Sequence, residues 1–526
     1  MALEVLPASL VPGTDIGLEL RRLPAPLPVW HGCVDRDAWN TAAIAAATVG
    51  GRLVSMWGVD RRGTGGGQVA CVAYALPQGL AWLELTLAES EDSFPDLGGV
   101  FACAGRMQRA MADLSGLRAD GQADTRPWLD HGLWAPGAPP LQHDARPAGA
   151  PAGSVPPDYP FVRVEGDGVH EIAVGPVHAG IIEPGHFRFS VVGEKVLRLE
   201  EHLGYVHKGI ERRFTELAPL EAHRLAGRVS GDSTVAYAWA YCMALESAWD
   251  CEIPVRAAWL RALMLERERV ANHLGDLGAL GNDAALSFGL AQFSRLREDW
   301  QRLSHEAFGH RFMMDAVVPG GTGIDLDPAL ALRMQRQCDV VELELRQLRT
   351  VYDEHAGLQD RFLTTGTVTP ELAARLGLTG LAGRASGQGF DLRCGQGWLP
   401  YDRLGVTMST RREGDVAARV ALRFDEALES LRLVKRVCAE LPAGPLRATL
   451  APPGKAALGS GWVEGWRGEV LVSLETGADG RILRCHCHDP SWQNWPVLEH
   501  AIIGNIVPDF PLINKSFNLS YSGHDL

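Results

Sequence analysis

The chain has 526 residues, enough for two to four domains, and its 46% apolar and 22% charged residues are the balance of a folded globular protein. Fifty basic and 64 acidic residues give a formal net charge of −14, which argues against a protein that coats nucleic acid. No apolar run approaches the ~20 residues that span a bilayer, and no secretory signal opens the chain. Ten cysteines, mostly single within apolar stretches, indicate reduced cytoplasmic thiols rather than disulfides.

Residues 1–134 predict a small α+β domain. Apolar and polar residues alternate in 67–76 and 79–88, which predicts two strands, while 42–47 and 105–114 predict short helices. The glycine-rich stretch 61–67 predicts only a turn, because no Lys-Ser/Thr pair follows it. We find no nucleotide-binding fingerprint in the chain.

Residues 135–160 contain eight prolines, which exclude a helix or a central strand and predict a linker between domains. The remainder, residues 161–526, predicts a second domain. The fold class is therefore α+β: a small N-terminal α+β domain, then a mainly α-helical bundle with a small β-sheet.

Within residues 161–526, the expected elements follow from hydrophobic periodicity. Alternation predicts strands at 169–174, 187–192, 195–199, 469–474 and 481–488. Helical spacing predicts helices at 234–249, 255–280, 286–312, 328–354 and 416–441, with a glycine-rich connection at 377–397. Asp232 or Ser233 is placed to cap the first of these helices.

Two segments carry candidate chemistry by residue type. One loop contains Gly175-Pro176-Val177-His178 and then Glu183-Pro184-Gly185-His186, so its imidazoles and carboxylate are suited to proton-coupled chemistry or simply to a polar turn. The other, Arg228-Val229-Ser230-Gly231-Asp232-Ser233, precedes a helix, where hydroxyls and a carboxylate also satisfy free backbone N–H groups.

Two further stretches have a structural interpretation. Cys and His alternate in 485–488, but on a strand the two Cys face one side and the two His the other, which disfavours a single metal site. The charged run from Glu200 to Glu211 is typical of a salt-bridged surface, although a buried run of this kind could carry protons.

Together these motifs resemble a known family. Residues 169–526 are similar to the large subunit of energy-converting [NiFe]-hydrogenases of the formate-hydrogenlyase type and to the quinone-site (D-type) subunit of respiratory complex I. Residues 1–134 resemble a degenerate form of the complex I C-type subunit that is often fused ahead of it. The stretches that carry the resemblance include the 175–187 loop, Leu203–Glu211, Glu266–Leu274, Pro319-Gly320-Gly321, Asn505–Leu526 and, in the first domain, Phe94-Pro95, Asp113–Leu117 and Trp134-Ala135-Pro136.

The chain departs from the hydrogenases where it matters for metal binding. The resemblance places the four thiolate ligands of the nickel–iron centre at Ser230, Ser233, Ser491 and Asn494, the last two after Asp489-Pro490. Nickel and low-spin iron need soft, deprotonated sulfur donors, which serine and asparagine do not supply. We therefore expect no [NiFe] centre and no cofactor bound by this chain alone.

The resemblance to complex I implies a quinone-like acceptor instead. His178 matches the first histidine of that family's loop, and His186 is the nearest counterpart of the second. The family's quinone-binding tyrosine falls at Gly231, so Asp232 or Tyr237 is the expected substitute proton donor. On this basis His178, His186, Asp232 and Tyr237 are the candidate catalytic residues, and Glu183, Arg228, Gly231 and Asp489 are the candidate cofactor-binding residues.

The chain has no iron–sulfur motif, so electrons would arrive from a partner. The resemblance implies a small subunit with a [4Fe–4S] cluster, a ferredoxin-like subunit and antiporter-like membrane subunits, with the chain on the cytoplasmic face of the inner membrane and electron transfer coupled to ion translocation. A redox-silent scaffold is the alternative, and an active [NiFe]-hydrogenase is the third hypothesis.

Overall fold

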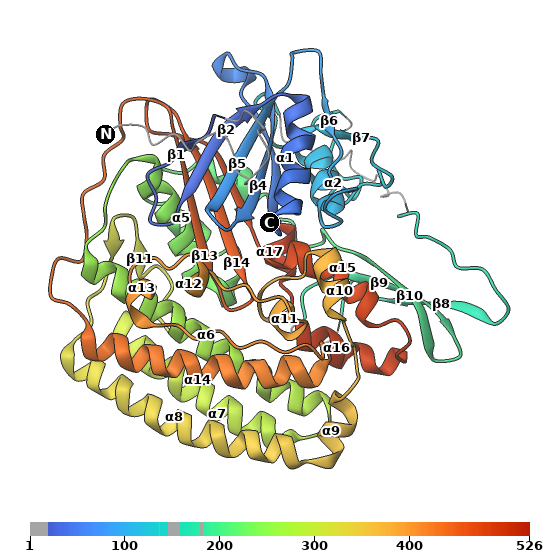
Figure 1. Ribbon diagram of the computed structural model, residues 1–526, viewed down its shortest axis with the longest axis vertical. Helices are drawn as coiled ribbons and strands as arrows, with labels where there is room; N and C mark the ends of the chain where they lie inside the picture. Colours follow the sequence, from blue (N-terminus) through green and yellow to red (C-terminus); the bar gives the residue numbers. More distant parts are fainter. Residues whose placement is uncertain (1–18, 136, 146–157, 179–181) are drawn as a thin grey trace.

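A computed structural model describes residues 19–526 except 136, 146–157 and 179–181. In the first domain, a five-stranded sheet has the order β1-β2-β5-β4-β3, in which only β2 and β5 run parallel. The helices α1 and α2 lie beside this sheet (Figure 1). The elements are β1 (Arg21–Arg22), β2 (Val29–Val34), α1 (Arg36–Thr48), β3 (Arg52–Asp60), η1 (Arg62–Thr64), β4 (Gln68–Leu76), β5 (Gly79–Thr86), β6 (Ser93–Pro95), α2 (Ala104–Ser115) and β7 (Arg118–Asp120).

The rest of the chain confirms the predicted mixture of a helical body with small sheets. The long helices α6, α7, α8 and α14 gather at the end of the molecule opposite the first sheet (Figure 1). The main elements are β8 (Val169–Val174), β9 (His186–Val192), β10 (Lys195–His202), α5 (Thr234–Ala248), α6 (Val255–Asp283), α7 (Ser287–Phe308), α8 (Pro328–Glu354), α14 (Val416–Glu440), β13 (Ala457–Glu464), β14 (Glu469–Thr476), β15 (Ile482–His488), α15 (Ser491–Ala501), α16 (Phe510–Phe517) and α17 (Tyr521–Asp525).

Shorter elements connect these. They are α3 (Ile210–Phe214), α4 (His223–Ala226), η2 (Gly231–Ser233), β11 (Val317–Val318), β12 (Gly321–Thr322), α9 (Ala356–Phe362), α10 (Pro370–Leu376), α11 (Gly380–Ala385), α12 (Leu392–Gly395), α13 (Tyr401–Leu404) and η3 (Val507–Asp509). The glycine-rich connection 377–397 thus contains two short helices. Among the described residues, no helix is both long enough and apolar enough to cross a bilayer.

Two glycines of β13 permit its packing against α5. A Cβ on Gly459 would lie 2.0 Å from the carbonyl oxygen of Ala244, and one on Gly461 would lie 1.9 Å from that of Ala240. Any larger side chain would collide with the helix backbone, so glycine is required at both positions. The same glycines weaken the strand pattern in the sequence, which explains why β13 was not predicted.

The predicted linker 135–160 is only partly described. Its residues 136 and 146–157 lie outside the described residues. The residues between them pack on the first domain, because the N–H of Leu141 donates to the Leu114 carbonyl at 2.9 Å and the His143 ring lies 3.2 Å from Asp60.

The first domain attaches to the body along β3, which lies against β14 and β15. Ser55 Oγ is 2.7 Å from His486 Nε2, and the Trp57 ring stacks on His486 with centroids 4.7 Å apart. The guanidinium of Arg61 bridges Glu84 of the first domain and Glu475 of the body, at 2.8 and 2.6 Å. These polar contacts fix the position of one domain on the other.

The body has a charged interior along α6. The side chains of the run Glu266-Arg267-Glu268-Arg269 are all buried. Glu266 accepts hydrogen bonds from Arg393, Tyr401 and Ser430 at 2.7 to 3.1 Å. Pairing of this kind offsets the cost of taking the Glu266 charge out of water.

Arg61→Ala tests the attachment of the first domain. It would leave the carboxylates of Glu84 and Glu475 largely buried and without this partner, so we expect a loss of about 3 kcal/mol in the free energy of unfolding. Denaturant titration measures it. The control is Arg118→Ala, which removes an exposed pair to Asp92 within the first domain and should cost under about 1 kcal/mol. Equal losses in the two variants would contradict the bridging role of Arg61.

Candidate functional site

Ser230 and Asp232, both singled out from the sequence, lie in one cluster with a third residue, Ser520. The Ser230 hydroxyl donates to Asp232 Oδ1 at 2.7 Å, and its oxygen lies 2.9 Å from Ser520 Oγ. Ser230 and Ser520 are buried. The cluster therefore joins the segment before α5 to the segment before α17, which are 290 residues apart in sequence.

An ion pair lies at the centre of this cluster. Arg467 donates from Nη1 and Nη2 to the two carboxylate oxygens of Asp232 at 2.9 and 2.5 Å, and its Nε donates to the Asn518 carbonyl at 2.5 Å. Burial alone would raise the pKa of Asp232, but the Arg467 charge and hydrogen bonds lower it below its usual value. Asp232 is therefore held as a carboxylate, which disfavours the proton-donating role expected for it.

The ion pair also overturns the predicted cap of α5. Neither Asp232 nor Ser233 makes a capping hydrogen bond. Glu268 of α6 accepts the N–H groups of Val235 and Ala236 at 2.7 and 3.2 Å instead. Burial raises the pKa of Glu268 to about 8 despite these two donors. Glu268, which is 33 residues from Val235 in sequence, caps the helix because the nearby carboxylate of Asp232 is paired with Arg467.

Tyr237 and Asp489 form a second contact of the site. The Tyr237 hydroxyl donates to Asp489 Oδ2 at 2.8 Å, and the N–H of Ser491 donates to Oδ1 at 2.8 Å. Tyr237, Asp489 and Ser491 are buried, and burial raises the pKa of the Tyr237 phenol well above its usual value. Two predicted site residues are thus brought together, with the tyrosine protonated near neutral pH.

The residue that faces Ser230 is Ser520, which sequence reasoning missed. The hydroxyl of Ser491 contacts the backbone of Ser520, since the N–H of Ser520 donates to Ser491 Oγ at 2.9 Å. The amide of Asn494 is turned to the Thr379 backbone, with hydrogen bonds of 3.0 and 3.2 Å. The sequence feature that could have indicated Ser520 is a spacing. Two residues separate Ser520 from Gly523, as two residues separate Ser230 from Ser233.

The 175–186 loop meets the cluster through the same segment. Glu183 accepts hydrogen bonds from the N–H and the hydroxyl of Ser522. A Cβ on Gly185 would lie 2.6 Å from the Tyr521 ring. His178 Nε2 lies 2.8 Å from the Gly185 carbonyl oxygen, so it supports the loop. Residues 179–181 of this loop lie outside the described residues.

His186 differs from His178 in its surroundings. It is buried at the start of β9, opposite His202 of β10, and its Nε2 has no hydrogen-bond partner among the described residues. Burial lowers its pKa, so the imidazole is neutral near pH 7. A neutral ring with an unpaired nitrogen can still accept or donate one hydrogen bond.

Two predicted cofactor-binding residues, Arg228 and Gly231, lie at the edge of the cluster. The exposed Arg228 pairs with Asp315 at 2.7 and 2.8 Å and donates to the Arg224 carbonyl, so its described hydrogen bonds do not join the cluster. Gly231 is exposed within η2, and a Cβ placed on it would meet nothing within 4 Å.

Several buried groups of the two remaining stretches have structural partners. His486 lies 2.6 Å from Glu211, and His488 lies 3.0 Å from Gln493. Glu201, in the predicted surface run, is buried and paired with Arg106, and burial raises its pKa to about 8. The run is therefore largely interior rather than a solvated face.

The cluster does not fit a nickel–iron centre. A hydroxyl and a carboxylate contact Ser230, and the guanidinium of Arg467 contacts Asp232 and Ser233. Hard oxygen donors bind nickel and low-spin iron poorly, and a resident cation repels a second one.

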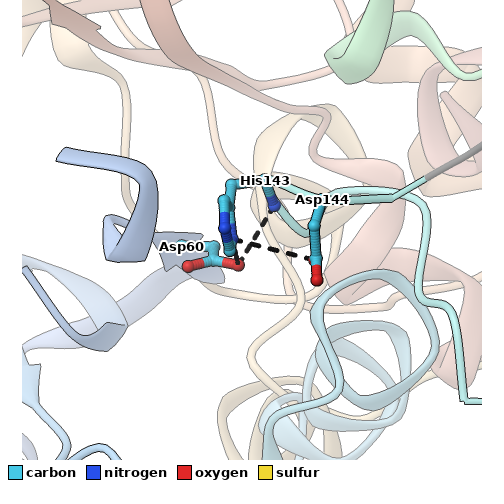
Figure 2. A group of neighbouring side chains, drawn as sticks. All are labelled: Asp60, His143 and Asp144. Atoms are coloured by element: carbon cyan, nitrogen blue, oxygen red, sulfur yellow. Dashed lines mark hydrogen bonds and ion pairs between the residues drawn. The ribbon is translucent and has the colours of Figure 1, made fainter.

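One group outside this site has the composition of a metal site. Asp60, His143 and Asp144 lie within reach of one another near the surface (Figure 2). Asp60 is already bound by Arg62 at 2.6 and 3.0 Å and by the backbone N–H of His143 at 3.1 Å. These partners account for the group without a metal.

Comparison with known proteins identifies the family. The family described as respiratory-chain NADH dehydrogenase, 49 Kd subunit, matches residues 283–459, and the 30 Kd subunit matches residues 33–151. The carbon monoxide-induced hydrogenase of Rhodospirillum rubrum is 32% identical over 66% of this chain and 97% of its own length. The chain belongs to this hydrogenase and complex I family.

Two further relatives extend the match. Formate hydrogenlyase subunit 5 of Escherichia coli is 28% identical over 90% of this chain and 85% of its own length, so it covers both domains. A chain of the membrane-bound sulfane sulfur reductase, an archaeal respiratory membrane complex, shares the fold with a TM-score of 0.64 at 23% identity, over 68% of this chain and 98% of that chain. These relatives confirm the predicted resemblance and the fold class.

The carboxyl of Glu268 predicts a pH dependence of stability. Its pKa of about 8 in the folded chain exceeds the ordinary glutamate value of 4.5, so the folded state holds the proton more tightly than the unfolded state. Stability is therefore lost as the pH rises from about 4.5 to 8, by a few kcal/mol at most. Glu268→Gln should show a shallower fall in melting temperature from pH 5 to 8 than the wild type. The surface variant Glu298→Gln should keep the wild-type slope, and equal slopes in all three proteins would contradict the protonation of Glu268.

Proposed function

We propose that this chain is the acceptor-site subunit of a membrane-associated, hydrogenase-like or complex I-like oxidoreductase that passes electrons to a quinone-like acceptor without a [NiFe] centre. The observation that supports this most is the Asp232–Arg467 ion pair beside Ser230 and Ser520. A family framework with this donor set suits organic acceptor chemistry rather than hydrogen activation at a metal. We also propose the division into domains at residues 1–134 and 161–526.

The acceptor would bind at the 175–186 loop. Its exposed Val177 and Ile182 offer apolar surface, and His186 offers an unpaired imidazole nitrogen. Reduction of a quinone by two electrons also takes two protons, so groups that hold a proton near the carbonyl oxygens are required. His186 would hydrogen-bond one oxygen. His178 and Glu183 would supply and return protons at the loop, the latter through its contact with Ser522.

Protons would reach the loop along the segment Ser520–Ser522. Ser520 contacts Ser230 in the cluster, and Ser522 contacts Glu183 in the loop. Tyr237, which is protonated near neutral pH, replaces Asp232 as the candidate donor on the cluster side. Asp232 then has an electrostatic role with Arg467.

Partners would complete the enzyme. We propose a small subunit with a [4Fe–4S] cluster and a ferredoxin-like subunit as the electron path, and antiporter-like membrane subunits for ion translocation. The chain would lie peripherally on the cytoplasmic face of the inner membrane. The relatives are subunits of hydrogenases, and the structural relative comes from a respiratory membrane complex.

A redox-silent scaffold is the second candidate. The closed hydrogen bonding of the cluster favours it, because Ser230, Asp232 and Asp489 all have partners within the chain. In that case the chain would only hold partner subunits together.

His186→Ala separates the two candidates. In the assembled complex, reduction of decylubiquinone should fall by about 10²-fold, the usual contribution of a positioned proton-transfer group. His170→Ala, an exposed histidine on the neighbouring strand β8, is the matched control and should keep full activity. If His186→Ala retains wild-type turnover while the complex remains assembled, the acceptor site is not at this loop and the scaffold is favoured.

Metal analysis tests the absence of a nickel–iron centre. The purified complex should contain less than about 0.1 nickel per chain, because the cluster offers no thiolate, and it should not evolve hydrogen with reduced viologen. Atomic emission and gas chromatography measure the two. Stoichiometric nickel with hydrogen evolution would overturn the proposal.

A further inference from the structure

A small cavity lies beside the Asp232 cluster, between α6, α7 and residues 311–313. Its volume is about 10 Å³, which is roughly the space of one water-sized sphere. Among the residues that line it are Asp232, Arg267, Glu268 and Gln301. Neither Arg267 nor Gln301 has a part in the site described above.

Arg267 is buried without a carboxylate partner. Its Nε donates to Ser304 Oγ at 3.0 Å, and its Nη2 donates to the Trp300 carbonyl at 2.8 Å and to Gln337 at 3.2 Å. Its Nη1 has no hydrogen-bond partner among the described residues, and its side chain has no exposed surface. Burial lowers the pKa of its guanidinium to about 10, so it still carries its charge at neutral pH.

The other buried arginines of α6 are different. Arg261 pairs with Glu246 at 2.6 Å, and Arg269 lies 3.3 Å from Glu266. A buried charge without a partner costs several kcal/mol, and a buried polar atom without a hydrogen bond is rare in folded proteins. Arg267 therefore lacks the counter-charge that its two neighbours on the same helix have.

Gln301 supplies a second unpaired donor to the same cavity. Arg311 donates to its Oε1 at 2.6 Å, which fixes the orientation of the amide, since a guanidinium cannot donate to an NH₂ group. The Nε2 of Gln301 is then the donor, and it has no partner among the described residues. This side chain is 3% exposed.

The charges around the cavity favour an anion. Arg467 neutralises Asp232 through two hydrogen bonds. Glu268 accepts two backbone N–H groups, and its pKa of about 8 leaves it mostly uncharged near pH 7. Arg311 adds a positive charge that Glu298 balances at 2.7 Å. The uncompensated charge at the cavity is that of Arg267.

We propose that this cavity binds one small monatomic anion of the halide class, held by the free N–H groups of Arg267 and Gln301. The volume suits an ion little larger than water and excludes carboxylates, sulfate and phosphate. The anion gives Arg267 the counter-charge that its neighbours obtain from glutamates. The inference rests on the fold and stands whether or not the chain reduces a quinone.

Bromide locates the anion directly. Crystals of the complex that contains the full chain are soaked in sodium bromide, and an anomalous difference map is calculated at the bromine edge. We expect a peak in the cavity, within about 3.5 Å of Arg267 Nη1 and Gln301 Nε2. A cavity that holds only water, with bromide peaks confined to the surface, overturns the proposal.

Gln301→Glu tests the same site in solution. The new carboxylate replaces the anion as the partner of Arg267. The melting temperature of the wild-type complex should rise by about 2 °C between 1 and 100 mM chloride at constant ionic strength set with gluconate, whereas the variant should show no rise. Gln292→Glu, a change of the same kind elsewhere on α7, should keep the chloride response. A chloride response that persists in Gln301→Glu contradicts the proposal.

Arg267→Gln provides a second readout. It removes the charge that the anion balances, so the bromide peak and the chloride response should both disappear. Arg302→Gln, on the exposed side of the same helix as Gln301, should retain both. If Arg267→Gln does not fold, Gln301→Glu still decides, because it keeps every other contact of the arginine.

Discussion

The ion pair between Asp232 and the buried Arg467 determines the arrangement of the site. Arg467 follows β13 and donates to the carbonyl of Asn518, while Asp232 precedes α5. One guanidinium thus connects three segments that are far apart in sequence. It pairs with the carboxylate of Asp232, so the N-terminus of α5 is capped by Glu268 instead. It also places a fixed positive charge beside Asp232 and Ser233.

Ion pairing extends from this point through the helical body. The charged run of α6 is buried, and Glu266 is held by Arg393, Tyr401 and Ser430. Such networks fix one arrangement of the helices, because the removal of any member leaves an unpaired charge in a medium of low polarity. The interior of this protein is specified by matched hydrogen bonds as much as by apolar packing. The polar groups of the site, such as Ser230 and Asp489, also have hydrogen-bond partners within the chain.

The local pattern of apolar and polar residues was sufficient to predict the long helices and part of the strands. Two strands of the first domain, β4 and β5, and the long helices were predicted from the pattern of apolar and polar residues, and α8 begins and ends where it was predicted. The strand β3 and the glycine-containing β13 lack a strict alternation of apolar and polar residues and were not predicted. Partners distant in sequence were not predictable: Ser520 faces Ser230 and Glu268 caps α5 only because the folded chain brings them together. The orientation of the Asn494 side-chain amide was likewise not predictable, because it is set by hydrogen bonds to the backbone of Thr379.

The contact of β3 with β14 and β15 has a consequence for how such proteins can be assembled. The interface between the domains contains Ser55, Trp57 and Arg61 on one side and His486 and Glu475 on the other. It does not depend on the covalent connection, whose contribution is to raise the effective concentration of one domain near the other to the millimolar range or so. Two separate polypeptides with the same surfaces would therefore associate in the same geometry, so a gene fusion or a gene split at this point changes the entropy of assembly rather than the architecture.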